Sequence, residues 1–295
     1  MPVDRLRILH ERASLIQDTR SFFVRQGFLE VETPIRIPAP APEAHIEPEP
    51  SGEWYLQASP ELAMKRLLAA GCTRIFQICK CFRRHEQGTL HLPEMTMLEW
   101  YRTEADYRDL MRDCERLLAA LTTDRHLTVR GHSIDLTSPW PRLTLAQAFD
   151  RFASIPLPQA MAEDRFEETL VMEVEPQLGL SSPLFLCDFP ASLASLACLH
   201  PDRKEVAQRF ELYVHGIELA NGFTELTDAA EQRHRFVEEQ QRIRALGREP
   251  GPMPEEFLAD LPTVPPAAGI ALGIDRLVML FTGVDRIDQT VSFTK

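Results

Sequence analysis

Apolar residues recur at helical spacing in several parts of this chain, and capping residues mark where most of these segments begin or end. The first segment stops at Gly27, which ends helices well because glycine adopts left-handed backbone conformations without strain. Ser59-Pro60-Glu61 starts another helix, since it supplies a capping hydroxyl, a proline for the first turn and an acid. The pattern predicts helices over 4–26, 59–71, 105–121 and 228–246, and in the segment after Gly273.

Runs rich in β-branched and aromatic residues lie between these helices and predict strands. RIFQICKCFR at 74–83 alternates as a strand, and EMTMLEWY at 94–101 is predicted to be its antiparallel partner. FLEVETP at 28–34 and LFLCDF at 184–189 are predicted as further strands, and the proline-rich stretch to residue 50 is predicted to be a loop. Strands with helices set to one side indicate an α+β fold with a mainly antiparallel sheet.

The segment FELYVHGIELANGFTEL, 210–226, carries three acids at intervals of seven: Glu211, Glu218 and Glu225. On a helix they would share one solvated face, but the glycines and the β-formers of this segment favour strands. Carboxylates on central strands are unfavourable unless they hold a cation or an ammonium group. A turn at 215–216 and a distortion at 221–222 are predicted to direct the three acids towards one cleft.

The charge of the chain argues against one class of partner and for another. A formal net charge of −12 is opposite to the basic face that broad nucleic-acid binding requires. The segment 62–85, however, contains no acid and six basic residues, Lys65, Arg66, Arg74, Lys80, Arg83 and Arg84. This segment indicates a locally bound anionic ligand; a solvated helix face followed by a charged strand end is the alternative.

Cellular location is predicted from what the sequence contains. No apolar run approaches the length that crosses a bilayer, and the amino terminus lacks the features of a signal peptide. The six cysteines are scattered in apolar contexts, and Cys79-Lys80-Cys81 lacks zinc-ribbon spacing. We therefore expect reduced structural cysteines in a cytoplasmic protein with no membrane partner.

Four short segments stand in an informative order: VETP, CFRRHE, ELANGFTEL and GIALGIDR. Each is weak alone, but together they resemble the motifs of class II aminoacyl-tRNA synthetases. SPELAMKRLL, PEMTMLEWY and GIALGIDRLVMLFTG narrow the resemblance to the lysyl branch. The first motif begins near residue 4, so we expect no amino-terminal anticodon-binding OB domain. The chain thus resembles the elongation factor P–(R)-β-lysine ligase family. The segment FPASLASLA at 189–197, and Ala271 in GIALG, also look more like this family than like lysyl-tRNA synthetases. We expect a single catalytic domain over 1–295.

The resemblance implies a role for each matching residue. It implies that Arg83 and Arg276 are catalytic, on the α-phosphate and on the γ-phosphate and adenine face of ATP. It implies that Glu211 and Glu218 hold Mg²⁺, which agrees with the preference of this ion for oxygen ligands. The substrate residues that it implies are Ser59, Glu61, Tyr101, Asn221, Phe223 and Glu225, the last for the side-chain ammonium of lysine. The further ATP residues are His85, Glu86, His91, Met95, Glu218, Leu219 and Gly273.

The sequence departs from the family pattern mainly in the second motif. His85 stands where a glutamate is usual, and Glu86 takes over its contact if the loop shifts by one residue. Leu92 replaces an asparagine, and Met95 replaces the phenylalanine that stacks on adenine; methionine still packs on a ring, more loosely. Asp288 stands where an arginine is usual.

The resemblance implies an ATP-dependent ligase that activates lysine or (R)-β-lysine as an adenylate. The aminoacyl group is then transferred to a lysine of elongation factor P, and the enzyme is expected to be a homodimer. Two alternatives remain. One is a lysyl-tRNA synthetase core that charges tRNA, against which the net negative charge and the expected lack of an OB domain weigh. The other is a non-catalytic module that binds an amino acid or an adenylate.

Overall fold

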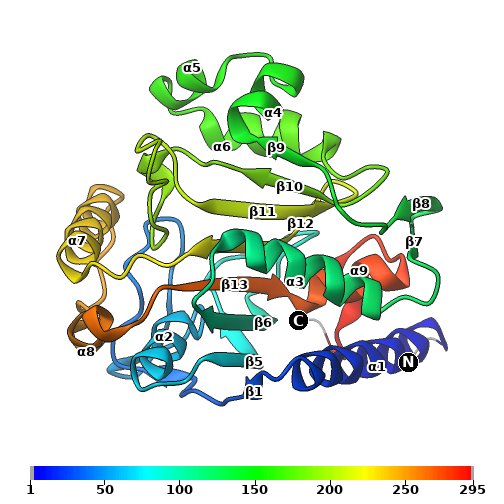
Figure 1. Ribbon diagram of the computed structural model, residues 1–295, viewed down its shortest axis with the longest axis horizontal. Helices are drawn as coiled ribbons and strands as arrows, with labels where there is room; N and C mark the ends of the chain where they lie inside the picture. Colours follow the sequence, from blue (N-terminus) through cyan, green and yellow to red (C-terminus); the bar gives the residue numbers. More distant parts are fainter. Residues whose placement is uncertain (1–2, 294–295) are drawn as a thin grey trace.

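The computed structural model describes residues 3–293 and is organised around one large sheet (Figure 1). Its eight strands follow the order β1-β5-β6-β13-β12-β11-β10-β9, and all neighbours are antiparallel except the two end pairs, β1–β5 and β9–β10. The predicted α+β class with a mainly antiparallel sheet is therefore confirmed. The strands are β1 (Leu29–Glu30), β5 (Arg74–Phe82), β6 (Glu94–Thr103), β9 (Arg142–Thr144), β10 (Leu184–Cys187), β11 (Arg209–Val214), β12 (Ile217–Thr224) and β13 (Ala267–Gly273).

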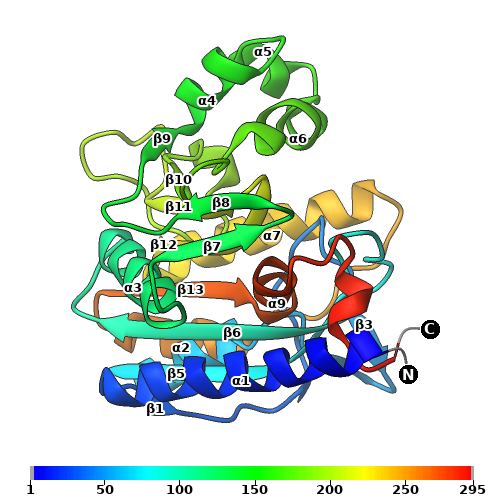
Figure 2. The same cartoon turned by 90° about the vertical axis from the view of Figure 1, so that its right-hand side faces the viewer.

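The helices form three groups around this sheet, not one group on one side (Figures 1 and 2). α1, α3 and α9 share one apolar core with the sheet, α2, α7 and α8 contribute to a second, and α4 to α6 lie beyond the β9 edge. Their bounds are α1 (Val3–Arg25), α2 (Glu61–Ala69), α3 (Tyr107–Ala120), α4 (Leu145–Phe152), α5 (Leu157–Ala162), α6 (Phe166–Thr169), α7 (Ala229–Ala245), α8 (Glu255–Asp260) and α9 (Ile274–Thr282). No helix within 3–293 has the length and apolarity needed to cross a membrane.

Neighbouring residues of each central strand belong to different cores, because side chains alternate between the two faces of a sheet. On β6, Trp100 packs into the core with α1 and α3, whereas Tyr101 belongs to the core with α2 and α8. On β13, Ala268 and Ala267 are divided in the same way. The face that carries Tyr101 is the face on which the cleft described below opens.

The predicted helix ends agree with the structure, because capping is a local interaction. Asp106 caps α3 in a capping box with Asp109, and the carboxylate of Asp228 accepts the first free amides of α7. The Ser59 hydroxyl accepts the amide of Glu61 at 3.0 Å at the start of α2. The six cysteines are free thiols, as predicted.

The predicted lengths of two amino-terminal segments were wrong. The strand expected over 28–34 is only β1, since it lies at the sheet edge with a single neighbour and soon reaches a proline. The proline-rich stretch expected to be a loop contains two short strands, β2 (Arg36–Ile37) and β3 (Glu49–Ser51), and these form a separate three-stranded sheet with β4 (Trp54–Leu56). Prolines fit there because these strands are short and lie outside the main sheet. A two-stranded sheet comprises β7 (His126–Val129) and β8 (His132–Asp135).

A β-bulge in the acidic hairpin β11–β12 decides where its carboxylates point. Glu211 is opposite Asn221, but Tyr213, two residues further on, is opposite Glu218, so β12 contains one extra residue, Leu219. The predicted distortion is present, two residues earlier than the expected place at 221. Because a bulge changes the alternation of side chains, Glu218 faces the same side as Asn221. The predicted turn at 215–216 is confirmed.

Candidate active site

A cleft of about 480 Å³ opens on the sheet face that carries Tyr101. Its floor comes from β6, β11, β12 and β13, and its walls come from the loops before α2 and after β5, from the start of α9 and from the segment 192–196. Fourteen of the sixteen predicted site residues line it: Ser59, Glu61, Arg83, Glu86, His91, Met95, Tyr101, Glu211, Glu218, Leu219, Asn221, Phe223, Gly273 and Arg276. The two that do not line it are His85 and Glu225.

His85 points away from the cleft, and Glu86 takes its expected place. His85 has a left-handed backbone, with φ of 65°, and its side chain is 71% exposed and lies nearest Glu47. Glu86 lines the cleft, with its carboxylate 3.6 Å from the guanidinium of Arg83. The expectation that His85 lies in the cleft is therefore corrected in favour of Glu86, because the turn of the loop shifts the acid by one residue, and a nucleotide contact of Glu86 stays a prediction.

Arg83 presents a guanidinium with few partners of its own. Within residues 3–293 its side chain donates no hydrogen bond, and its nearest carboxylate is that of Glu86 at 3.6 Å. Its Nε atom is buried without a partner. Two backbone contacts hold the residue in place: its amide donates to the carbonyl of Pro93, and it forms a bridge with Pro48. A fixed guanidinium with free donors suits bidentate binding of a phosphate.

Arg276, at the start of α9, is by contrast fully engaged. It donates to the carboxylate of Glu218 at 3.1 Å and to the backbone carbonyls of Glu218 and Leu90 at 2.6 and 3.2 Å. It also lies 2.7 Å from Nε2 of His91. Partial burial and the charge of Arg276 hold the pKa of His91 below its usual range, so the neutral ring accepts this hydrogen bond. This network orients Arg276 along the cleft wall.

Glu211 and Glu218 form a pair of neighbouring acids on the cleft floor. Glu211 accepts hydrogen bonds from Arg209 at 2.7 Å and from the Tyr213 hydroxyl at 2.8 Å. Burial and the charge of Glu218 raise the pKa of Glu211 to about 7. Although burial works in the opposite direction, Arg276 holds the pKa of Glu218 below its usual value.

The donor set of this pair fits a magnesium ion that arrives with a nucleotide. The part of the chain that the structure describes holds no group of three or more acids, histidines or cysteines arranged for a metal. Mg²⁺ in nucleotide sites, however, needs only one or two carboxylates, since phosphates and water supply the remaining oxygens. Glu211 and Glu218 supply two carboxylates on the cleft floor, and a bound cation would relieve the repulsion between their charges.

Glu99 is a cleft residue that the sequence analysis missed. Its carboxylate is 1% exposed and accepts hydrogen bonds from Ser59 Oγ at 2.7 Å and from the Tyr101 hydroxyl at 2.8 Å. Burial and the charge of Glu61 raise its pKa to about 7. The signal was present in EMTMLEWY: an acid in the middle of a central strand, two residues before Tyr101 and hence on the same face.

The raised pKa of Glu99 predicts a pH-dependent stability. Because the pKa of Glu99 is higher in the folded protein than its ordinary value of 4.5, its protonated carboxyl group favours the folded state. This contribution is complete below pH 4.5 and is lost as the pH rises through about 7. We expect the free energy of unfolding to fall between about pH 5 and 8, by on the order of 1–3 kcal/mol from this group. Urea unfolding of the wild type and Glu99→Gln across this range measures it. The variant should show a shallower slope, and equal slopes would contradict the assignment.

Lys65 lies beneath the cleft and is enclosed by two acids. Its side chain is fully buried, and its ammonium group is 2.6 Å from Oε1 of Glu61 and pairs with Oε2 of Glu225. Although burial disfavours its charge, these two carboxylates raise the pKa of Lys65. The lysine therefore remains protonated and connects α2 with the end of β12.

Glu225 consequently has a protein ammonium group beside it, which the sequence analysis did not foresee. Its second oxygen, Oε1, is buried, has no hydrogen-bond partner in the part of the chain that the structure describes, and lies against Gly269. A side chain at Gly269 would collide with this oxygen and with the ring of Tyr101. Burial raises the pKa of Glu225 to about 8, against the pull of Lys65. Glu225 thus lies one layer behind the cleft floor, with one oxygen free.

The fold and the cleft together are those of the class II aminoacyl-tRNA synthetase family. The antiparallel sheet supports an arginine with free donors at the end of β5, an acidic hairpin, and a second arginine at the start of α9. The family model of the class II tRNA synthetases (D, K and N) matches residues 4–295, and the chain belongs to this family.

Within this class, the chain belongs to the elongation factor P–(R)-β-lysine ligase family. It is 38% identical to the elongation factor P–(R)-beta-lysine ligase of Salmonella arizonae over 310 residues, which cover 97% of this chain and 94% of the relative. It is also 38% identical over 315 residues to the protein of the same name from Salmonella paratyphi B, with the same coverage.

Proposed function

We propose that this protein is an ATP-dependent ligase that activates (R)-β-lysine or lysine as an aminoacyl-adenylate and transfers it to a lysine side chain of elongation factor P. One observation carries the choice of amino acid. Glu61 and Glu99 line one end of the cleft, with Glu225 one layer behind them, and Lys65 is the ammonium group that pairs with two of these three acids within residues 3–293. A substrate with two ammonium groups balances this excess of carboxylates.

The remaining groups of the cleft suit adenylate formation. The substrate carboxylate attacks the α-phosphorus, the new C–O–P linkage forms, and pyrophosphate leaves. Arg83 has the free donors to bind the α-phosphate, and Arg276, which Glu218 holds in place, is the residue that we propose for the outer phosphates and the adenine face. No protein nucleophile is needed, because positioning and charge neutralisation account for the catalysis. Glu86, Met95 and His91 complete the proposed nucleotide site.

Magnesium is part of this proposal. Glu211 and Glu218 would hold it, and when bound the ion supplies positive charge against the phosphate oxygens. The carboxylate pair on its own orients Arg276 through Glu218 and is held in place by Arg209 and Tyr213. Leu219, Asn221, Phe223 and Gly273 shape the space for substrate and nucleotide.

Two assays test the proposal. ATP–pyrophosphate exchange should depend on (R)-β-lysine or lysine, and the comparison of the two settles which is preferred. Transfer of the labelled amino acid to purified elongation factor P should follow, and transfer to tRNA should be absent. Charging of tRNA without acylation of elongation factor P would favour a synthetase core, and absence of exchange would favour a binding module.

The proposal extends to the organisation of the protein. We infer that residues 1–295 act as one catalytic domain, since strands from both ends of the chain enter the same sheet. The family resemblance supports a cytoplasmic location and a homodimer. Light scattering of the purified protein tests the homodimer directly.

The carboxylate of Glu99 gives a prediction for amino-acid binding. Glu99→Gln removes its charge but preserves its shape and the donors of Ser59 and Tyr101. Hydrogen bonds to charged groups contribute roughly 1.5–3 kcal/mol, so (R)-β-lysine and lysine should bind about ten- to a hundredfold more weakly. Calorimetry should show ATP affinity unchanged. Glu94→Gln, exposed at the start of the same strand, is the matched control. Equal losses for ATP and amino acid would mean that Glu99 is structural.

A further inference from the structure

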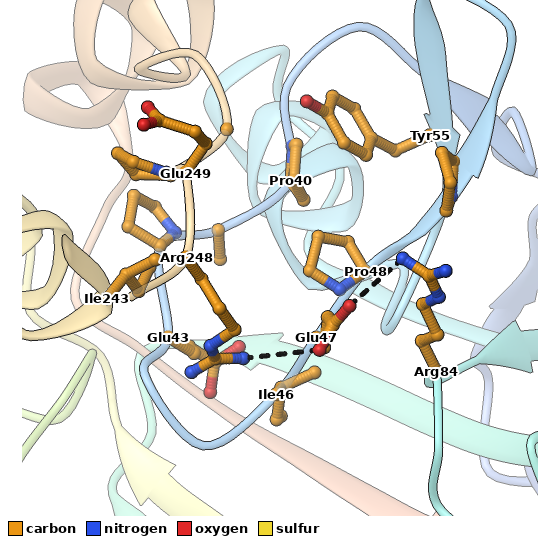
Figure 3. Close-up of a pocket in the computed structure, with 15 residues that line it drawn as sticks. Pro40, Glu43, Ile46, Glu47, Pro48, Tyr55, Arg84, Ile243, Arg248 and Glu249 are labelled. Carbon is orange, nitrogen blue, oxygen red and sulfur yellow. Dashed lines mark hydrogen bonds and ion pairs between the residues drawn. The ribbon is translucent and has the colours of Figure 1, made fainter. Parts of the chain in front are cut away.

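A second cavity of about 290 Å³ adjoins the cleft (Figure 3). The proline-rich segment 40–50 and the loop 248–251 form its walls, together with Tyr55, Arg84 and Ile243. Glu43 and Ile46 line both this cavity and the cleft, so they form the partition between the two. Nothing in the adenylation step described above uses the second cavity.

Glu43 differs from the other acid at the centre of this cavity, Glu47, because its carboxylate has no partner among the described residues. Glu47, its neighbour in the wall, lies 3.1 Å from Arg84 and 3.7 Å from Arg248, and both pairs are drawn in Figure 3. The carboxylate of Glu43, in contrast, makes no hydrogen bond or ion pair with any residue from 3 to 293. The backbone next to it is fixed, since the amide of Ala44 donates to Glu239 at 2.8 Å.

The charges around Glu43 come from four elements. Glu61 faces it from α2, Glu239 from α7, Arg83 from the end of β5 and Arg209 from β11. Burial within these walls and the charge of Glu61 raise the pKa of Glu43 to about 7, against the two arginines. A carboxylate of this kind accepts a proton more readily than an ordinary glutamate near neutral pH.

We propose that the second cavity admits the lysine side chain of the acceptor protein and that Glu43 is the group that takes a proton from its ε-ammonium. This inference rests on the proposed function and names the residue and the cavity that would serve its second half-reaction, the transfer of the aminoacyl group to the acceptor lysine. Under the proposed function the adenylate occupies the cleft, so the acceptor would approach through a wall that the adenylate leaves open. Glu43 lies in such a wall and near Arg83, where the α-phosphate is proposed to bind.

The chemistry of the transfer balances without any further reactant. The ε-ammonium gives one proton to the Glu43 carboxylate, and the neutral amine attacks the carbonyl carbon of the adenylate. The C–N bond forms, the bond between this carbon and the phosphate oxygen breaks, and AMP leaves with the electron pair. The amide nitrogen loses its second proton to solvent, and Glu43 then releases its own.

Glu43→Gln separates this role from amino-acid binding. A general base contributes typically 10²–10⁴-fold, so transfer to elongation factor P should fall at least about a hundredfold at pH 7. ATP–pyrophosphate exchange should stay within about threefold of the wild type, because adenylation needs no base at this position. The transfer rate of the variant should rise about tenfold per pH unit towards the lysine pKa of about 10.4, since free amine then becomes available. The wild type should respond less steeply.

Hydroxylamine supplies the decisive comparison, because this nucleophile is neutral at pH 7 and needs no base. Trapping of the adenylate by hydroxylamine should be equal in the wild type and Glu43→Gln. The matched control is Glu53→Gln. Glu53 is an exposed acid in the turn between β3 and β4, and its substitution should change neither half-reaction. Transfer by Glu43→Gln within about threefold of the wild type would overturn the proposal. Equal losses in exchange and transfer would overturn it too, since Glu43 would then bind the amino-acid substrate. Absence of exchange and transfer in the wild type would instead refute the proposed function.

Discussion

Arg83→Ala should lower ATP–pyrophosphate exchange by about 10²–10³-fold, the typical effect of removing a group that stabilises charge in a transition state. The expectation follows from the free donors of this guanidinium, in a cleft whose other lining arginines are already paired with acids: Arg209, Arg242 and Arg276. Because the side chain of Arg83 forms no hydrogen bond with any residue that the structure describes, its loss should leave the fold intact.

Two measurements make this prediction specific. Circular dichroism and urea unfolding should show a stability within about 1 kcal/mol of the wild type, as is usual for a residue without structural partners. Arg74→Ala, at the other end of β5 and exposed, is the matched control and should retain full exchange activity. Exchange by Arg83→Ala within a few-fold of the wild type would place the α-phosphate elsewhere in the cleft.

Lys65→Met should destabilise the protein by about 3–5 kcal/mol, because removing one partner of a buried ion pair leaves the other charge uncompensated. The ammonium group of Lys65 is fully buried and pairs with both Glu61 and Glu225. Methionine has a similar volume, so the loss should come from charge and not from a cavity. Urea unfolding at neutral pH measures the effect.

A second substitution tests whether the charge of Glu225 is the cause. In the double variant Lys65→Met/Glu225→Gln, one of the two unpaired carboxylates is gone, so part of the lost stability should return. The single variant should also recover stability at low pH, where its carboxylates are protonated. A loss below about 1 kcal/mol for the single variant would show that the ion pair is weak. No recovery in the double variant would mean that packing of the lysine stem matters instead.

Local patterns predicted the elements of this fold well. The caps at Asp106 and Asp228 and the pairing of β5 with β6 depend on residues that are close in sequence, so their signals are visible in a short window. The strand expected over 28–34 failed because its length depends on the number of its neighbours in the sheet, which no local pattern contains. Proline content likewise did not exclude short strands in a separate small sheet.

For the site, the order of short motifs along the chain predicted sixteen residues, and fourteen of them line one cleft. Residue type and motif order were enough to predict that Arg83 and the acidic hairpin lie in the same cleft. His85 and Glu86 could not be separated, since a shift of one residue depends on how a loop turns. Glu99 was missed although its burial was foreseeable from its strand position.

By itself, the sequence determined the class of fold, the family, and which residue types gather in the cleft, because secondary structure and motifs are written in short-range patterns. Only the tertiary structure decided the state of each charge. Lys65 and Glu225 are 160 positions apart in the chain, yet they pair because α2 packs under the end of β12. Glu43 has no hydrogen-bond or ion-pair partner among residues 3–293 for the same kind of reason. The free energy of a charge depends on burial and on neighbours in space, and both arise only when distant segments pack together.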